Sequence, residues 1–279
     1  MKPTPRSFVF DLLSTIRRGT MPVGALVEAA ALFGIPENNL RVALARLLAA
    51  GQVTRDERGR YRLGPEASPL SRRLGSWRHP ERSVRPWGGG WIGVHLERSA
   101  SRTDRREREK ALRLYGFRSL TAALAARPDN LKAGVGEIRV ELRSLGLPAG
   151  DLVFAIRDLD RETESRARRL WDSTGIREGH RRLLVQLRRS ERRLPGLPVE
   201  EAMVESFVLG GEVIRSLVLD PLLPDEICRS RERDALAAAM RRYDDLGRAA
   251  WAEFLARFDV PHHRNPIHTR LVGGAAAFA

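Results

Sequence analysis

Apolar residues recur at intervals of three and four along the first fifty residues, which is the pattern of amphipathic helices. This spacing predicts three helices, over residues 7–18, 22–33 and 36–50. Polar and apolar residues then alternate on both sides of Gly59, as they do in a half-buried β-hairpin. Three helices followed by a two-stranded ribbon predict a winged helix-turn-helix domain over residues 1–68.

The middle of the chain follows a different pattern. A connector rich in proline, glycine and arginine spans residues 69–90. After it we expect alternating strands and helices, with residues 117–128 as one strand and a further strand near 128–135. The resulting β-α-β-β-α-β order predicts a ferredoxin-like domain over residues 91–160.

Amphipathic segments make up most of the remaining chain and predict a helical C-terminal domain over residues 161–260. The expected helices are 162–172, 177–194, 198–217 and 231–258. The last carries more apolar residues than one small domain needs, so it is a candidate homodimer surface, with the ferredoxin-like domain as the alternative. Beyond it we expect a flexible tail over residues 261–279. The fold class is therefore α+β.

The net charge of the chain indicates which classes of partner to expect. It carries 49 lysines and arginines against 35 acidic residues, a net charge of +14. Such an excess favours nucleic acid first and an anionic membrane surface second. Neither a lipid-attachment motif nor a basic amphipathic terminal helix supports the membrane alternative. Without a signal peptide or an apolar run of about 18 residues, the protein is expected in the cytoplasm.

Residues for metal or redox chemistry are sparse. The one cysteine, Cys228, allows neither a disulfide within the chain nor a cysteine-based zinc site. His262 and His263 have no carboxylate cluster beside them in the sequence. Glu97 and Asp151 flank predicted strands, but the pattern brings no group of carboxylates together for Mg²⁺. We therefore expect no metal, no cofactor and no catalytic residues.

The third predicted helix has one apolar face and one small face that is nearly free of acid. If Leu40, Leu44 and Leu47 lie in the core, the small face can enter a major groove about 12 Å wide. There asparagine can read adenine and arginine can read guanine, while arginines of the wing contact phosphates. The predicted DNA-binding residues are Asn38, Asn39, Arg41, Val42, Ala45, Arg46, Arg55, Arg58 and Arg60. Two alternatives stay open: solvated surface arginines, and a winged helix used for protein contact.

Three stretches carry a family resemblance. They are LRVALARLLAAGQV at 40–53, WGGGW at 87–91 and RSLVLDPLLPDEIC at 215–228. In combination they resemble the PaaX family of bacterial repressors of phenylacetic-acid catabolism genes. The resemblance implies a homodimer that binds double-stranded operator DNA and is released by an acyl-CoA thioester. The sequence departs from the family pattern at Ala45, where the family has serine, and at Gly88, where it has aspartate.

Composition alone suggests residues for such an effector, because arginines suit its phosphates and tryptophan rings can stack on an aromatic group. The candidates are Trp87, Trp91, Trp171 and Arg215. For each tryptophan, a place in the core is the alternative.

A second function class is a nucleic-acid-processing or RNA-binding protein that uses the middle domain. A repressor shifts duplex DNA without Mg²⁺ and leaves it uncut, which distinguishes the two classes.

Overall fold

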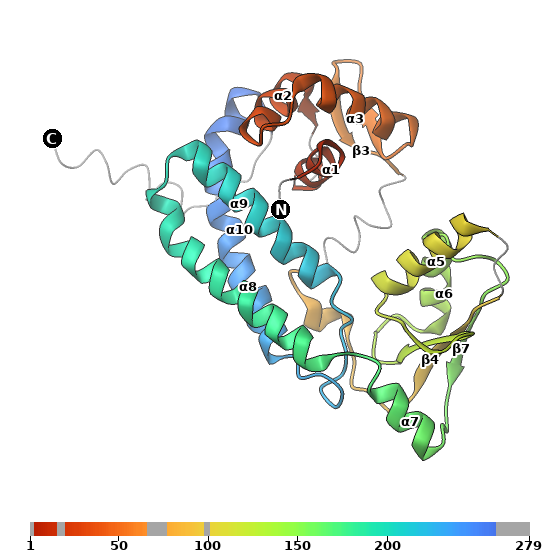
Figure 1. Cartoon of the computed structure of the whole chain (residues 1–279). Coiled ribbons are helices and arrows are strands. Elements are labelled where there is room, and N and C mark those ends of the chain that lie inside the picture. Colours follow the sequence, from red (N-terminus) through yellow and green to blue (C-terminus); the bar gives the residue numbers. More distant parts are fainter. Residues whose placement is uncertain (1–2, 16–19, 66–76, 98–100, 261–279) are drawn as a thin grey trace. The chain divides into compact units, whose positions relative to one another are not determined.

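The computed structural model describes residues 3–15, 20–65, 77–97 and 101–260 (Figure 1). The predicted tail over 261–279 and residues 66–76 of the predicted connector lie outside this part of the chain. Two compact units are present. The N-terminal unit comprises Met1–Ser71, Gln186–Val213 and Ala239–Ala279, and the sheet unit comprises Arg72–Val185 and Ile214–Ala238. The division into three domains stays a prediction.

The N-terminal unit begins with three helices and a hairpin, in the predicted order. Its first elements are α1 (Pro5–Thr15), β1 (Met21–Pro22), α2 (Val23–Leu32), α3 (Glu37–Ala49), β2 (Val53–Arg55) and β3 (Arg60–Leu63). The three strands form an antiparallel sheet in the order β1-β3-β2. The two-residue β1 was not predicted, because it is too short to show an alternating pattern.

The turn between α2 and α3 has a local cause. Gly34 takes a φ of +69°, a conformation that side chains with a Cβ rarely adopt. The N–H of Ile35 donates to the carbonyl of Ala30 at 3.1 Å, which closes α2 in a Schellman-type arrangement. Pro36 then precedes α3 with a φ of −61° and an extended ψ. These residues fix where the exposed helix α3 starts.

Helices from the end of the sequence complete the core of the N-terminal unit. They are α9 (Val199–Val218) and α10 (Arg231–Arg257). Before them in the chain come α8 (Ser173–Arg193) and the short η3 (Leu194–Gly196). Phe207 of α9 contacts Phe8 at 5.4 Å and Phe33 at 5.0 Å between ring centroids. Trp251 and Phe254 of α10 join the same buried cluster. The first helices therefore do not form a closed core by themselves.

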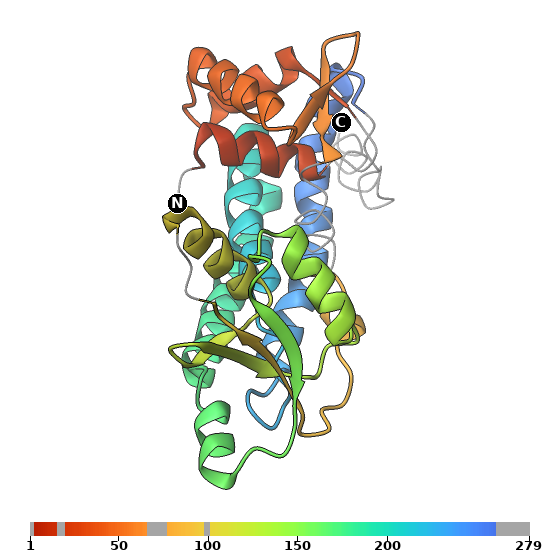
Figure 2. The same cartoon turned by 90° about the vertical axis from the view of Figure 1, so that its right-hand side faces the viewer.

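The sheet unit contains four antiparallel strands and three helices of its own. The elements are η2 (Pro80–Ser83), β4 (Trp91–His95), α5 (Arg102–Leu114), β5 (Arg118–Thr121), β6 (Leu124–Pro128), α6 (Val135–Ser144), β7 (Leu152–Ile156) and α7 (Arg161–Arg168). The strand order is β5-β6-β4-β7. Figures 1 and 2 show α5 and α6 on the same face of this sheet.

Two strand predictions in this unit are wrong. Residues 117–128 form not one strand but the hairpin β5–β6, and no strand runs through the described residues 129–135. The hairpin turns at Ala122 and Ala123, where the N–H of Ala123 donates to Thr121 Oγ1 at 3.3 Å. Because neither alanine is a usual turn residue, the sequence pattern gives no sign of the reversal.

Candidate nucleic-acid interface

The exposed face of α3 carries the residues that the sequence predicts for base contact. Asn38, Asn39, Arg41, Val42, Ala45 and Arg46 are all exposed. On the opposite face Leu40, Ala43, Leu44 and Leu47 are buried against α1 and α2. Val42 keeps 43% of its surface accessible, which is unusual for valine on a packed helix. The structure therefore brings these six residues onto one solvent-facing surface.

An ion pair that the sequence reasoning missed lies on this face. Arg41 NH2 is 2.7 Å from Glu37 Oε1, and Arg41 Nε donates to the same oxygen at 2.8 Å. Both side chains are more than half exposed, and such a pair is worth only about 0.3–0.5 kcal/mol. The spacing of four residues between Glu37 and Arg41 could have predicted this pair from the sequence. A stronger hydrogen-bond acceptor can therefore take the place of Glu37 as the partner of Arg41 at little cost in free energy.

The wing is the turn between β2 and β3. Asp56 Oδ1 accepts the backbone N–H groups of Arg58 at 3.1 Å and Arg60 at 2.8 Å, which shapes the turn. The side chains of Arg55 and Arg58 are exposed, and the Arg55 guanidinium lies 5.8 Å from the centre of the Tyr61 ring. Both arginines agree with the predicted projection from the ribbon.

Arg60 does not project as predicted. Its Nε donates to Thr20 Oγ1 at 2.8 Å, and its NH2 donates to the carbonyl of Asp259 at 3.0 Å. The cause is its position on the strand, because Arg60 lies opposite Pro22 in the β1–β3 ladder and faces that edge. Arg60 ties β3 to the residues after α10. Arg62, which the sequence reasoning did not select, is the exposed arginine of β3.

Three of the four predicted effector residues meet in the sheet unit. Trp91 and Trp171 stack at 6.2 Å with an interplanar angle of 12°, and Trp87 meets Trp91 edge-on at 5.4 Å. Trp91 and Trp171 are 1% and 5% exposed, so one face of each ring is already occupied by the other. Arg168 covers the Trp87 ring at 4.7 Å. The three tryptophans therefore form a core cluster, which is the alternative that the sequence left open.

The indole N–H groups of this cluster also have partners. Trp91 Nε1 donates to Glu164 Oε2 at 2.7 Å, and Trp171 Nε1 donates to the carbonyl of Gly116 at 3.1 Å. Arg215, the fourth predicted effector residue, lies exposed on α9. Its part in an effector site stays a prediction.

The acidic residues of the middle domain serve structural roles. Asp151 is fully buried, and Arg108 holds it through Nε to Oδ2 at 2.6 Å and NH2 to Oδ1 at 2.7 Å. The N–H of Glu97 donates to the same carboxylate at 2.9 Å. Asp160 caps α7 by accepting from the N–H groups of Glu162 and Thr163. A hydrogen bond with the Thr163 side chain, together with these N–H groups, lowers the pKa of the Asp160 carboxyl. Within the described ranges, no group of three or more histidine, cysteine or acidic residues could hold a metal ion.

A second buried ionic cluster lies in the sheet unit. Asp220 contacts His180 Nε2 at 3.2 Å and Arg233 NH1 at 3.6 Å, and its Oδ1 accepts the N–H of Leu222 at 2.7 Å. Burial lowers the pKa of His180, although the charge of Asp220 opposes this. The neutral imidazole is consistent with the contact, since it can donate its Nε2 hydrogen to Asp220 while Arg233 compensates the carboxylate. The adjacent cavity of about 10 Å³ is too small for a ligand.

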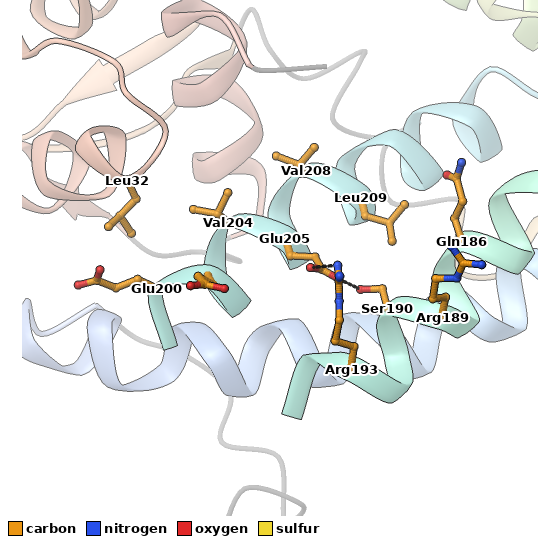
Figure 3. A pocket seen from close by; sticks show the side chains of 11 residues that line it. Leu32, Gln186, Arg189, Ser190, Arg193, Glu200, Val204, Glu205, Val208 and Leu209 are labelled. Atoms are coloured by element: carbon orange, nitrogen blue, oxygen red, sulfur yellow. Dashed lines mark hydrogen bonds and ion pairs between the residues drawn. The ribbon is translucent and has the colours of Figure 1, made fainter. Parts of the chain in front are cut away.

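A larger groove lies in the N-terminal unit beside the end of α2 (Figure 3). Its volume is about 830 Å³, within the range of small-molecule sites. Leu32 comes from α2, and the rest of the lining comes from α8 and α9. Sequence reasoning missed this groove, because its walls come from segments more than 150 residues apart.

One comparison with known proteins covers the segment that contains α3. Residues 4–67 match the family model described as PaaX-like protein. This match confirms the resemblance over the segment that holds α3 and the wing. No curated protein matches the chain. Among solved structures, an uncharacterized protein, Rv0674, from Mycobacterium tuberculosis is 26% identical, with a TM-score of 0.57. The alignment covers 91% of this chain and 98% of that one.

The match to the family model ends close to the end of the hairpin, whereas the structural likeness continues through both units. No helix in the described part of the chain combines the length and apolar character needed to cross a membrane.

Proposed function

We propose that this chain is a sequence-specific DNA-binding transcriptional regulator. The observation that carries the proposal is the exposed, nearly acid-free face of α3 within the segment that matches the PaaX-like model. Three helices and the antiparallel sheet β1-β3-β2, with β1 between α1 and α2 and the hairpin β2–β3 after α3, support a winged helix-turn-helix in residues 1–68. In such a domain the second helix of the motif, here α3, enters the major groove.

Base recognition follows from the chemistry of the exposed face. Asn38 or Asn39 can donate to and accept from adenine, and the small Val42 and Ala45 can approach thymine methyl groups. Arg41 can make two hydrogen bonds to guanine once it leaves Glu37. Each good bidentate contact discriminates by about 1–3 kcal/mol. The exposed ion pair with Glu37 is weaker, so exchange to the base is favourable.

Phosphate contacts supply the remainder of the affinity. Arg46 on α3 and Arg55 and Arg58 on the wing are exposed arginines around the recognition face, and the net charge of +14 adds a long-range attraction. Arg60 is not among the proposed phosphate contacts, because its guanidinium already donates to Thr20 and to the carbonyl of Asp259.

The sheet unit supports the remaining parts of the proposal. Its β-α-β-β-α-β order and the strand arrangement β5-β6-β4-β7 support a ferredoxin-like domain over residues 91–160. One winged helix covers few base pairs, so a homodimer on two half-sites is the physical default. In line with the family resemblance, we propose a cytoplasmic repressor of a catabolic operon that a small molecule, such as an aryl- or acyl-CoA thioester, releases.

The test is a duplex gel shift with the full chain, first on the upstream region of its own gene and then on a randomised duplex library. Arg41→Ala should relax preference at one base pair and cost roughly 1–3 kcal/mol of binding. Thermal stability should stay unchanged, since the side chain is 55% exposed. Arg105→Ala, an exposed arginine on α5, serves as the matched control. Unchanged operator affinity in Arg41→Ala would contradict the placement of this residue at a base.

The same experiment addresses the second function class. A regulator binds duplex DNA without Mg²⁺ and leaves it intact, whereas cleavage on addition of Mg²⁺ would favour nucleic-acid processing. Asp151 is an unsuitable ligand for such a metal, because Arg108 engages both of its oxygens.

A further inference from the structure

The groove in the N-terminal unit has two different walls. One wall is aliphatic and consists of Leu32 from α2 with Val204, Val208 and Leu209 from α9. The other is polar and consists mainly of α8 residues, as Figure 3 shows. An apolar ligand body against the first wall and a polar group against the second is the arrangement that small-molecule sites use.

The charges of the groove are separated along its length. Glu200 lies at the end beside Leu32, whereas Arg189 and Gln186 lie at the other end (Figure 3). Glu201, the next residue of α9, also lines the groove. Arg189 forms no ion pair with any residue in the described part of the chain. The second groove arginine, Arg193, is held by Glu205 through an ion pair. One uncompensated positive charge therefore faces the groove at one end only.

The centre of the groove is fixed by hydrogen bonds. Ser190 Oγ donates to Glu205 Oε1 and lies 2.6 Å from the hydroxyl of Tyr243, which therefore acts as donor to Ser190. Burial raises the pKa of Tyr243 to about 12, so the hydroxyl stays protonated. Glu205 is thus satisfied by Ser190 and Arg193. It does not compete for Arg189.

From this arrangement we infer that the groove binds a small amphipathic carboxylate with an aliphatic body and a single anionic head. The head lies at Arg189 and the body lies along Val204, Val208 and Leu32. A coenzyme A thioester lacks the free carboxylate that the inference places at Arg189, so it should bind this groove more weakly than the free acid. The inference rests on the proposed function only for its regulatory meaning, and for this groove it puts a free carboxylate in place of the thioester named above as an example of the effector.

The position of the groove gives the ligand a route to α3. Leu32 is the last residue of α2, and the next residue, Phe33, packs on Phe207 at 5.0 Å. Phe207 lies on α9 between the groove residues Val204 and Val208. A ligand that displaces Leu32 or α9 therefore acts on the aromatic contact that holds the α2–α3 turn. Its binding and DNA binding are then thermodynamically coupled.

Calorimetry on the full chain without DNA tests the chemistry. The probes are octanoate, its neutral analogue octanamide, and octanoyl-CoA. Octanoate should bind, and octanamide should bind about tenfold more weakly, because it lacks the charge-assisted contact with arginine. Octanoyl-CoA should also bind more weakly than octanoate. Equal affinity for acid and amide, tighter binding of the thioester, or no binding of octanoate overturns the inference.

Substitutions in the groove test whether octanoate binds there. Arg189→Gln should weaken octanoate about tenfold, whereas Arg192→Gln, an exposed arginine on α8 outside the lining, should leave it unchanged. Leu209→Trp should fill the groove and abolish binding, with circular dichroism as the check on folding. If both arginine variants behave alike, or if Leu209→Trp still binds in its folded state, the site lies elsewhere.

The gel shift separates this inference from the proposed function. Specific operator binding by a protein that ignores octanoate overturns the carboxylate site and leaves the proposed regulator standing. Octanoate binding that depends on Arg189, without any specific duplex binding, leaves the site standing and overturns the regulator.

Discussion

The core of the N-terminal unit consists mainly of aromatic and aliphatic side chains, whereas the interior of the sheet unit also contains charged side chains. Among the described residues, the buried polar side chains of the N-terminal unit are two serines, Ser190 and Ser206. Those of the sheet unit are Arg108, Arg127, Asn130, Asp151, His180, Asp220 and Arg233. Apolar packing depends on shape and volume, while buried charges depend on complete pairing. The two units should therefore fail under different perturbations.

Arg127 illustrates the second kind of core. It is fully buried on β6, and its guanidinium donates to Asn130 Oδ1 at 3.0 Å and to the carbonyl of Pro221 at 3.3 Å. Asn130 in turn donates to the carbonyl of Leu222 at 2.7 Å. These hydrogen bonds tie the loop at 221–222 to β6, so they hold it in place in addition to its apolar contacts.

The largest effect is expected from Asp151→Ala. The substitution leaves Arg108 buried without its partner, which costs roughly 3–5 kcal/mol of the free energy of unfolding. Urea unfolding followed by tryptophan fluorescence measures the loss. Asp160→Ala is the control, since it removes only an exposed helix cap and should cost much less. If the two variants lose the same amount, the buried pair does not stabilise the sheet unit.

In the N-terminal unit the corresponding test is Phe33→Ala. It opens a cavity between α1, α2 and α9 and should cost about 3 kcal/mol. Val42→Ala, on the exposed face of α3, should stay within about 0.5 kcal/mol in the same urea experiment. A small loss for Phe33→Ala would mean that α9 does not complete this core.

Two glycines with nearly the same backbone conformation compare the units directly. Gly34 has a φ of +69°, and apart from its two chain neighbours no residue has an atom within 4 Å of the point that a Cβ would occupy there. Gly116 has a φ of +71°, and Pro221 Cα lies only 2.7 Å from the corresponding point. Gly34→Ala should cost about 1–2 kcal/mol from backbone strain alone. Gly116→Ala should cost more, because the backbone of Pro221 must also move. Thermal unfolding ranks the two, and equal losses would contradict close packing at Gly116.

The smallest effect concerns pH. The folded-state pKa of His180 lies below its ordinary value of 6.5, because burial opposes the charged form. Below pH 6.5 the unfolded state therefore binds more protons than the folded state, and stability falls until the pH passes the folded-state pKa. Urea unfolding on either side of pH 6.5 should show a loss for the natural protein that is smaller in His180→Gln. An identical pH dependence in both would exclude His180 as its source.

Much of the N-terminal architecture could be predicted from the sequence. Leu40, Leu44 and Leu47 repeat at helical spacing and are buried, so the exposed face of α3 followed directly. The pairing of Arg41 with Glu37 was readable from their spacing. The fate of Arg60 was not, because Thr20 and Asp259 approach it only through the tertiary fold.

The sheet unit was harder to predict for a physical reason. A charged residue in a sequence looks solvated, so Asp151 and Arg127 gave no sign that they are fully buried. From the sequence, the tryptophans at 87, 91 and 171 could either pack in a core or stack on a ligand, because an indole ring suits both. Their contacts with one another in the structure identify a core cluster. The groove beside Leu32 had no local signature at all.

The discontinuous core of the N-terminal unit has a consequence for biosynthesis. Phe8 and Phe33 leave the ribosome long before Trp251 and Phe254, which complete their cluster. At about 5–20 residues per second, the intervening chain takes on the order of ten to forty seconds to translate. During that interval the nascent helices expose apolar surface. A chaperone that shields aromatic segments should therefore raise the yield of this protein more than that of a regulator whose DNA-binding domain folds alone.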